Sequence, residues 1–248
     1  LMTGLRYLDL ADGRRIATRF RPGSGPTLVF LPGYASDMEG SKAVALDGWA
    51  AERGNPILRL DYSGTGRSSG RFEEGTLARW IEEAGAAIDR LTSGPLILVG
   101  SSMGGWIMLH LALERADRIA GLLGIAAAPD FTDWGFTDTD KATLQRDGRL
   151  DQPNPYGPEP QVTTLGFWQS GEQLKLLGAP IPIDAPVRLI HGDRDPDVPL
   201  EIAVRLKDAL RSADVQLTVV KGGGHRLSAP HEIAAILRLA GDLVELAR

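Results

Sequence analysis

Short and nearly uninterrupted apolar runs recur along the chain and alternate with segments of helical character. The runs are PTLVFLPG (26–33), NPILRLD (55–61), PLILVGS (95–101), RIAGLLGIAAA (118–128), PVRLIHG (186–192) and VQLTVVKG (215–222). Strands that are apolar on both sides are typical of a parallel sheet whose two faces are covered by helices. The expected helices lie at 41–54, 76–91, 103–115 and 200–210, with a last one from about 231. The alternation predicts an α/β fold with a doubly wound sheet.

Local turn and cap signals mark the ends of several elements. The first 20 residues read as a hairpin, LRYLDL and RRIATRF, whose strands are joined at Asp12-Gly13, a strong turn signal. Ser41 is a candidate N-cap for the helix 41–54, and Gly54 is a candidate stop. We therefore expect an antiparallel hairpin ahead of the parallel part of the sheet.

Composition excludes several classes of function. The chain has 248 residues, of which 43% are hydrophobic, and a formal net charge of −5 with no basic stripe, which argues against nucleic acid as a partner. It has no cysteine, so disulfides and thiolate chemistry are excluded. No apolar run approaches the ~18 residues that span a membrane, and the N-terminus lacks the order of a signal peptide. We expect a soluble, cytoplasmic protein; a removed leader and the oligomeric state stay open.

The regular alternation of strands and helices stops at residues 129–184. This segment is rich in proline, aromatic and polar residues and is too long for an ordinary loop. We interpret it as a cap or lid, with 1–128 and 185–248 forming the core, and take Trp134 and Trp168 as candidates for substrate binding. The alternative is a surface insertion that only covers the edge of the sheet.

Two adjacent serines follow the apolar run at 95–101. A nucleophilic serine is held on a sharp strand-to-helix turn, where the residues two before and two after it must be small. Ser102 is flanked in this way by Gly100 and Gly104, whereas Ser101 is flanked by the bulky Val99 and Met103. The pattern predicts Ser102 as the nucleophile, against the alternative of a Gly-Ser turn without chemistry.

A nucleophilic serine needs a general base, and the chain offers four histidines. His110 lies inside a predicted helix, His191 ends a predicted strand and His231 begins the last helix. His225 stands in KGGGHRL, directly after the last strand, and follows the serine and a group of acids in the chain. The order serine, acid, histidine favours His225 as the base.

The acid that orients the histidine is expected in the loop HGDRDPDVP, which follows the strand at 186–192. Asp193, Asp195 and Asp197 are all candidates, and the residues alone do not choose between them. The spacing resembles a calcium loop, but its sixth position is Val198 and its twelfth is Val204, where glycine and glutamate are needed. We expect no metal here.

Two backbone amides are candidates for the oxyanion hole. The Met103 amide directly follows the nucleophile, and the Tyr34 amide follows the strand PTLVFLPG, where Gly33 allows a close approach of the backbone. The glycine-rich segment DYSGTGRSSG (61–70) has neither the spacing of a dinucleotide-binding loop nor the Gly-Lys-Ser/Thr of a P-loop. We interpret it as a structural turn.

Taken together, these segments resemble the α/β-hydrolase superfamily. LPGYASD, DYSGTGRSSG, GSSMGGW, HGDRDPDVP and GGGHRL occur in the family order across almost the whole chain. More narrowly, the chain resembles the group that contains the mitochondrial acyl-glucuronide esterase, also described as a palmitoyl-protein thioesterase. The resemblance implies an α/β-hydrolase fold, with an eight-stranded sheet whose strand 2 is antiparallel and a small cap between strands 6 and 7. The family pattern His-Gly-x-x-Asp-x-x-Val-Pro implies that Asp195 is the acid.

The sequence therefore predicts a serine hydrolase without a cofactor that acts on a small-molecule ester or thioester. The acyl chain and the leaving group stay open, because a fold does not dictate a substrate. One alternative is another hydrolysis by the same triad, of a carbon–carbon bond or a peptide. Another is a non-catalytic binding protein, against which the presence of all three candidate residues counts.

Overall fold

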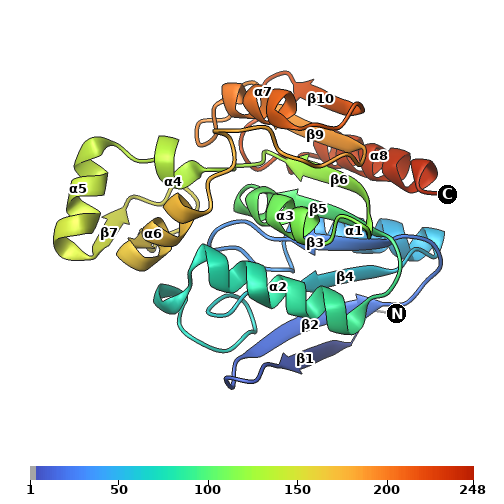
Figure 1. Cartoon of the computed structure of the whole chain (residues 1–248), viewed down its shortest axis with the longest axis horizontal. Helices are drawn as coiled ribbons and strands as arrows, with labels where there is room; N and C mark the ends of the chain where they lie inside the picture. Colours follow the sequence, from blue (N-terminus) through green and yellow to red (C-terminus); the bar gives the residue numbers. More distant parts are fainter. Residues whose placement is uncertain (1–3) are drawn as a thin grey trace.

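The computed structural model describes residues 4–248, which form a twisted sheet with helices on both faces (Figure 1). In this part of the chain the main sheet has eight strands in the order β1-β2-β4-β3-β5-β6-β9-β10. Their bounds are β1 (Leu5–Asp9), β2 (Arg15–Arg21), β3 (Thr27–Leu31), β4 (Ile57–Leu60), β5 (Leu96–Ser101), β6 (Ile119–Ile125), β9 (Val187–Gly192) and β10 (Val215–Val220). Strand β2 runs antiparallel to β1 and β4, and the other neighbours are parallel. The predicted α/β fold is confirmed.

Helices cover the two faces of the sheet and enclose two apolar cores. On one face α1 (Ser41–Arg53) and α8 (Pro230–Leu246) pack against the central strands through residues such as Leu46 and Leu243. On the other face lie α2 (Leu77–Leu91), α3 (Met103–Glu114) and α7 (Leu200–Ala209), with Trp80 and Trp106 in the interior. Strand β3, TLVFL, is buried over its whole length between these layers, as its apolar sequence requires. No helix within residues 4–248 is both long and apolar enough to span a membrane.

Most element ends follow the predicted signals, with one exception at α1. The hairpin β1–β2 turns at Gly13, which has φ 91°, and Gly54 ends α1 with φ 70°. Ser41, however, is the first helical residue of α1, and Gly40 takes the N-cap position without a side-chain hydrogen bond. The predicted Ser41 cap is therefore wrong by one residue: Gly40 already has the extended backbone that an N-cap needs, so Ser41 joins the first turn.

The chain between β6 and β9 forms a separate group of small elements, which lies at one end of the molecule (Figure 1). They are α4 (Phe131–Trp134), α5 (Asp138–Asp147), β7 (Arg149–Gln152), β8 (Gln161–Thr164) and α6 (Leu165–Gln173), with β7 and β8 paired antiparallel. This is the segment 129–184 that the sequence singles out. Its elements begin and end between the sixth and seventh strands of the main sheet.

Partly buried hydrogen bonds join the two ends of this segment to each other and tie its end to the core. Asp130 lies at its start, and its carboxylate accepts hydrogen bonds of 2.8 Å from the amides of Leu176 and Leu177 near its end. The neighbouring Leu174 carbonyl accepts from the ring nitrogens of two α3 residues, Trp106 at 3.1 Å and His110 at 2.9 Å. Helix α3 therefore helps to hold the segment in place.

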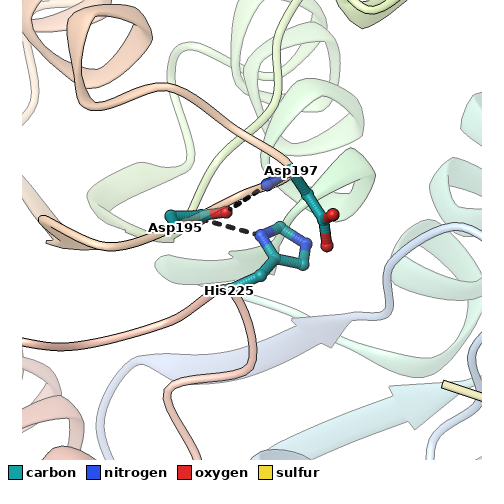
Figure 2. A group of neighbouring side chains, drawn as sticks. All are labelled: Asp195, Asp197 and His225. Carbon is teal, nitrogen blue, oxygen red and sulfur yellow. Dashed lines mark hydrogen bonds and ion pairs between the residues drawn. The ribbon is translucent and has the colours of Figure 1, made fainter. Parts of the chain in front are cut away.

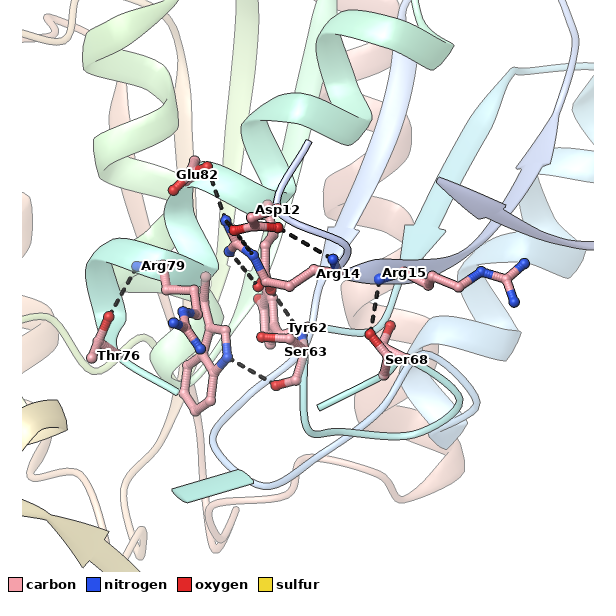
Figure 3. A network of polar contacts seen from close by, with 12 residues as sticks. Asp12, Arg14, Arg15, Tyr62, Ser63, Ser68, Thr76, Arg79 and Glu82 are labelled. Carbon is pink, nitrogen blue, oxygen red and sulfur yellow. Dashed lines mark hydrogen bonds and ion pairs between the residues drawn. The ribbon is translucent and has the colours of Figure 1, made fainter. Parts of the chain in front are cut away.

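A buried carboxylate connects the hairpin β1–β2 to helix α2 and to the turn at 61–70. Glu83 in α2 is fully buried and accepts hydrogen bonds from Arg14 at 2.8 Å and from the Ser63 amide at 2.8 Å. Arg14 also reaches Glu82, which is on the surface of the same helix (Figure 3). Removing Glu83 leaves the Ser63 amide without its partner and takes from Arg14 its fully buried carboxylate, so that only the exposed Asp12 and Glu82 still pair with it.

We expect Glu83→Ala to lower the free energy of unfolding by about 3 kcal/mol, the usual cost of breaking a buried ion pair. Glu82→Ala is the matched control, because its side chain is 67% exposed and pairs with the same arginine. That variant should lose less than ~1 kcal/mol. Urea unfolding followed by tryptophan fluorescence measures both. If the two variants lost the same free energy of unfolding, the buried contact would stabilise the fold no more than the exposed one does.

Candidate active site

Ser102 lies at the sharp turn between β5 and α3, with a backbone conformation of φ 54° and ψ −120°. A side chain at either flanking glycine has no room: a Cβ at Gly100 would lie 2.3 Å from the Gly104 carbonyl oxygen, and one at Gly104 would lie 2.0 Å from that of Leu31. The left-handed φ of a non-glycine residue stores strain. The local structure therefore has the form that the glycine spacing predicts, with Ser102 at its centre.

The structure brings Ser102 and His225 together across 123 residues of sequence. The Ser102 hydroxyl oxygen lies 3.1 Å from His225 Nε2. On the other side of the ring, His225 Nδ1 lies 2.9 Å from Asp195 Oδ2 (Figure 2). With a proton on Nδ1 that is donated to Asp195, Nε2 is free to accept the serine proton. The three side chains thus form a continuous chain of hydrogen bonds.

Of the three acids in the loop after β9, only Asp195 contacts His225. Its side chain is fully buried, and Oδ1 accepts hydrogen bonds of 2.9 Å from the amides of Asp197 and Val198. Asp193 is exposed and accepts from the Gly222 amide, whereas Asp197 accepts from the hydroxyl of Tyr156. The geometry agrees with the choice of Asp195 that the family pattern implies.

The surroundings of Asp195 keep its carboxylate ionised. Burial alone raises the pKa of this group, but the hydrogen bond and the charge of His225 lower it, as do the two loop amides. The net pKa of Asp195 lies below its ordinary value. At neutral pH the carboxylate is therefore negative and can stabilise a positive charge on His225.

Two of the other histidines are hydrogen-bonded to backbone carbonyls. His191 is buried at the end of β9 and contacts the Val198 carbonyl at 2.8 Å, and its Nε2 is 3.4 Å from Asp195 Oδ2. His110 contacts the Leu174 carbonyl, as described above. Asp195, Asp197 and His225 present possible metal-ligand atoms within 4.8 Å of one another (Figure 2). The hydrogen bond between Asp195 and His225 already accounts for the proximity of two of these groups.

The two predicted oxyanion amides belong to segments that meet at Ser102. Gly33 lies against Ser102, since a Cβ placed there would be 3.3 Å from the Ser102 Cβ atom. Within residues 4–248, neither the Tyr34 nor the Met103 amide donates a hydrogen bond to another group. Both N–H groups are thus unpaired, one in the residue after Ser102 and the other in the residue after Gly33.

A cavity of about 900 Å³ opens above Ser102 and His225. Its walls come from the core and from the segment 129–184, which contributes Phe131, Trp134 and Phe136 among other residues. Trp168 does not line this cavity; its indole N–H donates to the Thr132 carbonyl at 2.9 Å instead. The structure therefore places only one of the two candidate tryptophans near the site.

Sequence reasoning did not single out Tyr156, which is one of the residues that line the cavity. This residue of the β7–β8 connection bonds to Asp197, and the Arg226 guanidinium lies 4.5 Å above its ring. It therefore contacts both loops that carry Asp195 and His225. The only signal in the sequence was its place among the aromatic residues of 129–184.

Comparisons with known proteins agree with this architecture. The model of the "Alpha/beta hydrolase family" matches residues 28–236. The human mitochondrial palmitoyl-protein thioesterase ABHD10 is 35% identical over 247 residues, which cover 98% of this chain and 81% of that protein. The structure of mouse alpha/beta hydrolase domain-containing protein 10 superimposes with a TM-score of 0.91 at 33% identity, covering 98% of each chain. A crystal structure from Agrobacterium vitis S4 has the same TM-score at 38% identity and the same coverage.

We expect Ser102→Ala to abolish covalent labelling by a fluorophosphonate probe, because the probe reacts only with an activated serine hydroxyl. Ser101→Ala is the matched control, since this neighbour has no hydrogen bond to His225 and should label at close to the wild-type rate. Labelling is measured by the mass of the intact protein over time. The assignment is wrong if Ser102→Ala still labels while Ser101→Ala does not.

Proposed function

The chain belongs to the alpha/beta hydrolase family and is an ester or thioester hydrolase, and we propose that it works through an acyl-enzyme on Ser102. The observation that carries the proposal is the hydrogen-bonded chain Ser102–His225–Asp195, with distances of 3.1 and 2.9 Å, at the floor of the cavity. A serine, a base and an orienting acid in this arrangement are suited to acyl transfer.

In the acylation step, His225 takes the hydroxyl proton of Ser102 while Oγ attacks the acyl carbonyl carbon. The negative charge that develops on the carbonyl oxygen is stabilised by the amides of Tyr34 and Met103. His225 then gives its proton to the leaving alcohol or thiol, and the bond from the acyl carbon to the leaving group breaks. Asp195 stabilises the positive charge that His225 carries between these two transfers.

In the deacylation step, a water molecule attacks the acyl-enzyme while His225 accepts one of its protons. The same oxyanion amides stabilise the second tetrahedral intermediate. When it collapses, His225 returns the proton to Ser102 Oγ and the carboxylic acid leaves. The serine and the histidine end each cycle in the state in which they began.

We further propose that the acyl group is a fatty acyl chain held by a thioester. The mammalian relatives are named as palmitoyl-protein thioesterases, and the aromatic side chains of Phe131, Trp134 and Phe136 give one wall of the cavity an apolar surface. Apolar surface of this kind favours long acyl chains. The cytoplasmic location stays a prediction, and the mammalian relatives are named as mitochondrial proteins.

The role of Asp195 is tested by Asp195→Asn, for which we expect kcat on p-nitrophenyl butyrate to fall by about 10⁴-fold. The amide cannot stabilise the protonated histidine, and it favours the wrong tautomer of His225. Asp193→Asn, which changes an exposed acid of the same loop, should stay within about threefold of the wild type. Thermal unfolding confirms that both variants are folded. A severe loss in Asp193→Asn alone would contradict the assignment.

The substrate proposal is tested with p-nitrophenyl esters from acetate to laurate. Each buried methylene contributes about 0.8 kcal/mol, so kcat/KM should rise roughly three- to fourfold per carbon until the cavity is full. Trp134→Ala should shift the preferred chain length, because Trp134 lines the cavity, whereas Trp168→Ala should leave it unchanged. Each rate is divided by the fraction of the enzyme molecules that the fluorophosphonate probe labels, so that only active enzyme is compared. A flat wild-type profile would exclude selection of acyl chains by this cavity.

A further inference from the structure

The side chain of Tyr34 extends from the core into the segment 129–184. Its hydroxyl donates a hydrogen bond of 2.5 Å to the Val162 carbonyl in strand β8. Its ring lies 4.9 Å from that of Phe167 and 6.0 Å from that of Phe131, and both of these residues belong to the same segment. Burial raises the pKa of the Tyr34 phenol, so the group stays protonated and remains a hydrogen-bond donor.

The main chain on either side of Tyr34 is held by the core. The Tyr62 hydroxyl, which is fully buried, donates to the Pro32 carbonyl at 2.9 Å. The Gly33 carbonyl accepts from the Ser36 amide at 3.2 Å and closes a tight turn. The core therefore holds the turn, and two of its aromatic rings also pack against the Tyr34 ring at 5.1 and 6.0 Å. The Tyr34 hydroxyl group, in contrast, is bonded to the segment 129–184. The Tyr34 amide lies between these two sets of contacts, since it is bonded to the same Cα as the side chain.

We propose that Tyr34 is a positioning residue. Its side chain connects strand β8 to its own backbone amide, so that the position of β8 determines the geometry of the oxyanion hole. The inference rests on the proposed function, in which the Tyr34 amide stabilises the oxyanion. Oxyanion donors act at 2.7–3.1 Å, and a displacement of about 1 Å can cost much of their effect. Loss of the bond to Val162 therefore affects the transition state more strongly than the bound substrate.

The test is Tyr34→Phe, which removes only the hydroxyl group. Removal of a whole oxyanion donor costs about 10²–10³ in kcat, so we expect a smaller loss, of about tenfold, when the donor is only less well placed. KM for p-nitrophenyl butyrate should stay within about twofold, because the ground state makes little use of the hole. Tyr7→Phe removes a hydroxyl from an exposed tyrosine on β1 and should leave kcat unchanged.

A second readout separates positioning from a general loss of structure. A trifluoromethyl ketone forms a tetrahedral adduct with the serine and places an oxyanion in the hole, so its affinity for Tyr34→Phe should fall by the same factor as kcat. Phe167→Leu is a second variant, because Phe167 contacts the Tyr34 ring but is not part of the cavity lining in the described chain. It should lower kcat several-fold without a change in KM.

The inference is overturned if Tyr34→Phe retains kcat within twofold of the wild type, or if KM rises while kcat and the affinity for the ketone do not change. If Tyr34→Phe does not fold, the inference is judged from Phe167→Leu by the same criteria. Failure of the proposed function has a different signature: the wild-type protein itself then fails to react with the fluorophosphonate or to hydrolyse the ester.

Discussion

Helix α3 begins in direct backbone contact with strands β5 and β3, and this contact determines where Ser102 can lie. The chain reverses from β5 into α3 within one residue, which takes a φ of 54°. Such a conformation costs about 1–3 kcal/mol and persists only when the packing around it allows no alternative. Gly100 and Gly104 provide that packing, since neither position has space for a Cβ atom. The strain and the close contact together hold the hydroxyl out of the fold.

The remaining parts of the site are placed around this point by the parallel sheet. Strands β3, β5 and β9 are parallel to their neighbours, so the loops after them meet at one edge. These loops carry Tyr34, Ser102 and Asp195, and the loop after β10 adds His225. The segment 129–184 then covers this edge and supplies aromatic walls to the cavity. The proposed catalytic groups thus come from the ends of the strands, and aromatic walls of the cavity come from the segment inserted between β6 and β9.

The sequence was sufficient for the fold and for the position of Ser102, because both depend on local patterns. Apolar runs of strand length and glycines two residues from the serine are readable without tertiary information. The three acids were different, since the residues alone left Asp193, Asp195 and Asp197 equivalent and only the resemblance to the family selected Asp195. The physical distinction is the loop conformation, which turns Asp195 inward to His225. Trp134 and Trp168 likewise differ only in the direction that helices α4 and α6 give them. The differences among the three acids and between the two tryptophans both depend on contacts between distant segments. The spacing of apolar residues along the sequence does not encode such contacts.

The separation of Ser102 and His225 by 123 residues has a consequence for synthesis of the chain. At 5–20 residues per second, the ribosome adds the histidine roughly 6–25 s after the serine. Strand β5 and helix α3 are complete long before that, whereas β9 and β10 are the last strands of the sheet to be made. In the proposed mechanism a nascent chain therefore carries Ser102 before its base has been made, so the hydroxyl is not yet activated. On that mechanism, activity requires that β9 and β10 have joined the sheet, and turnover would then report on complete folding.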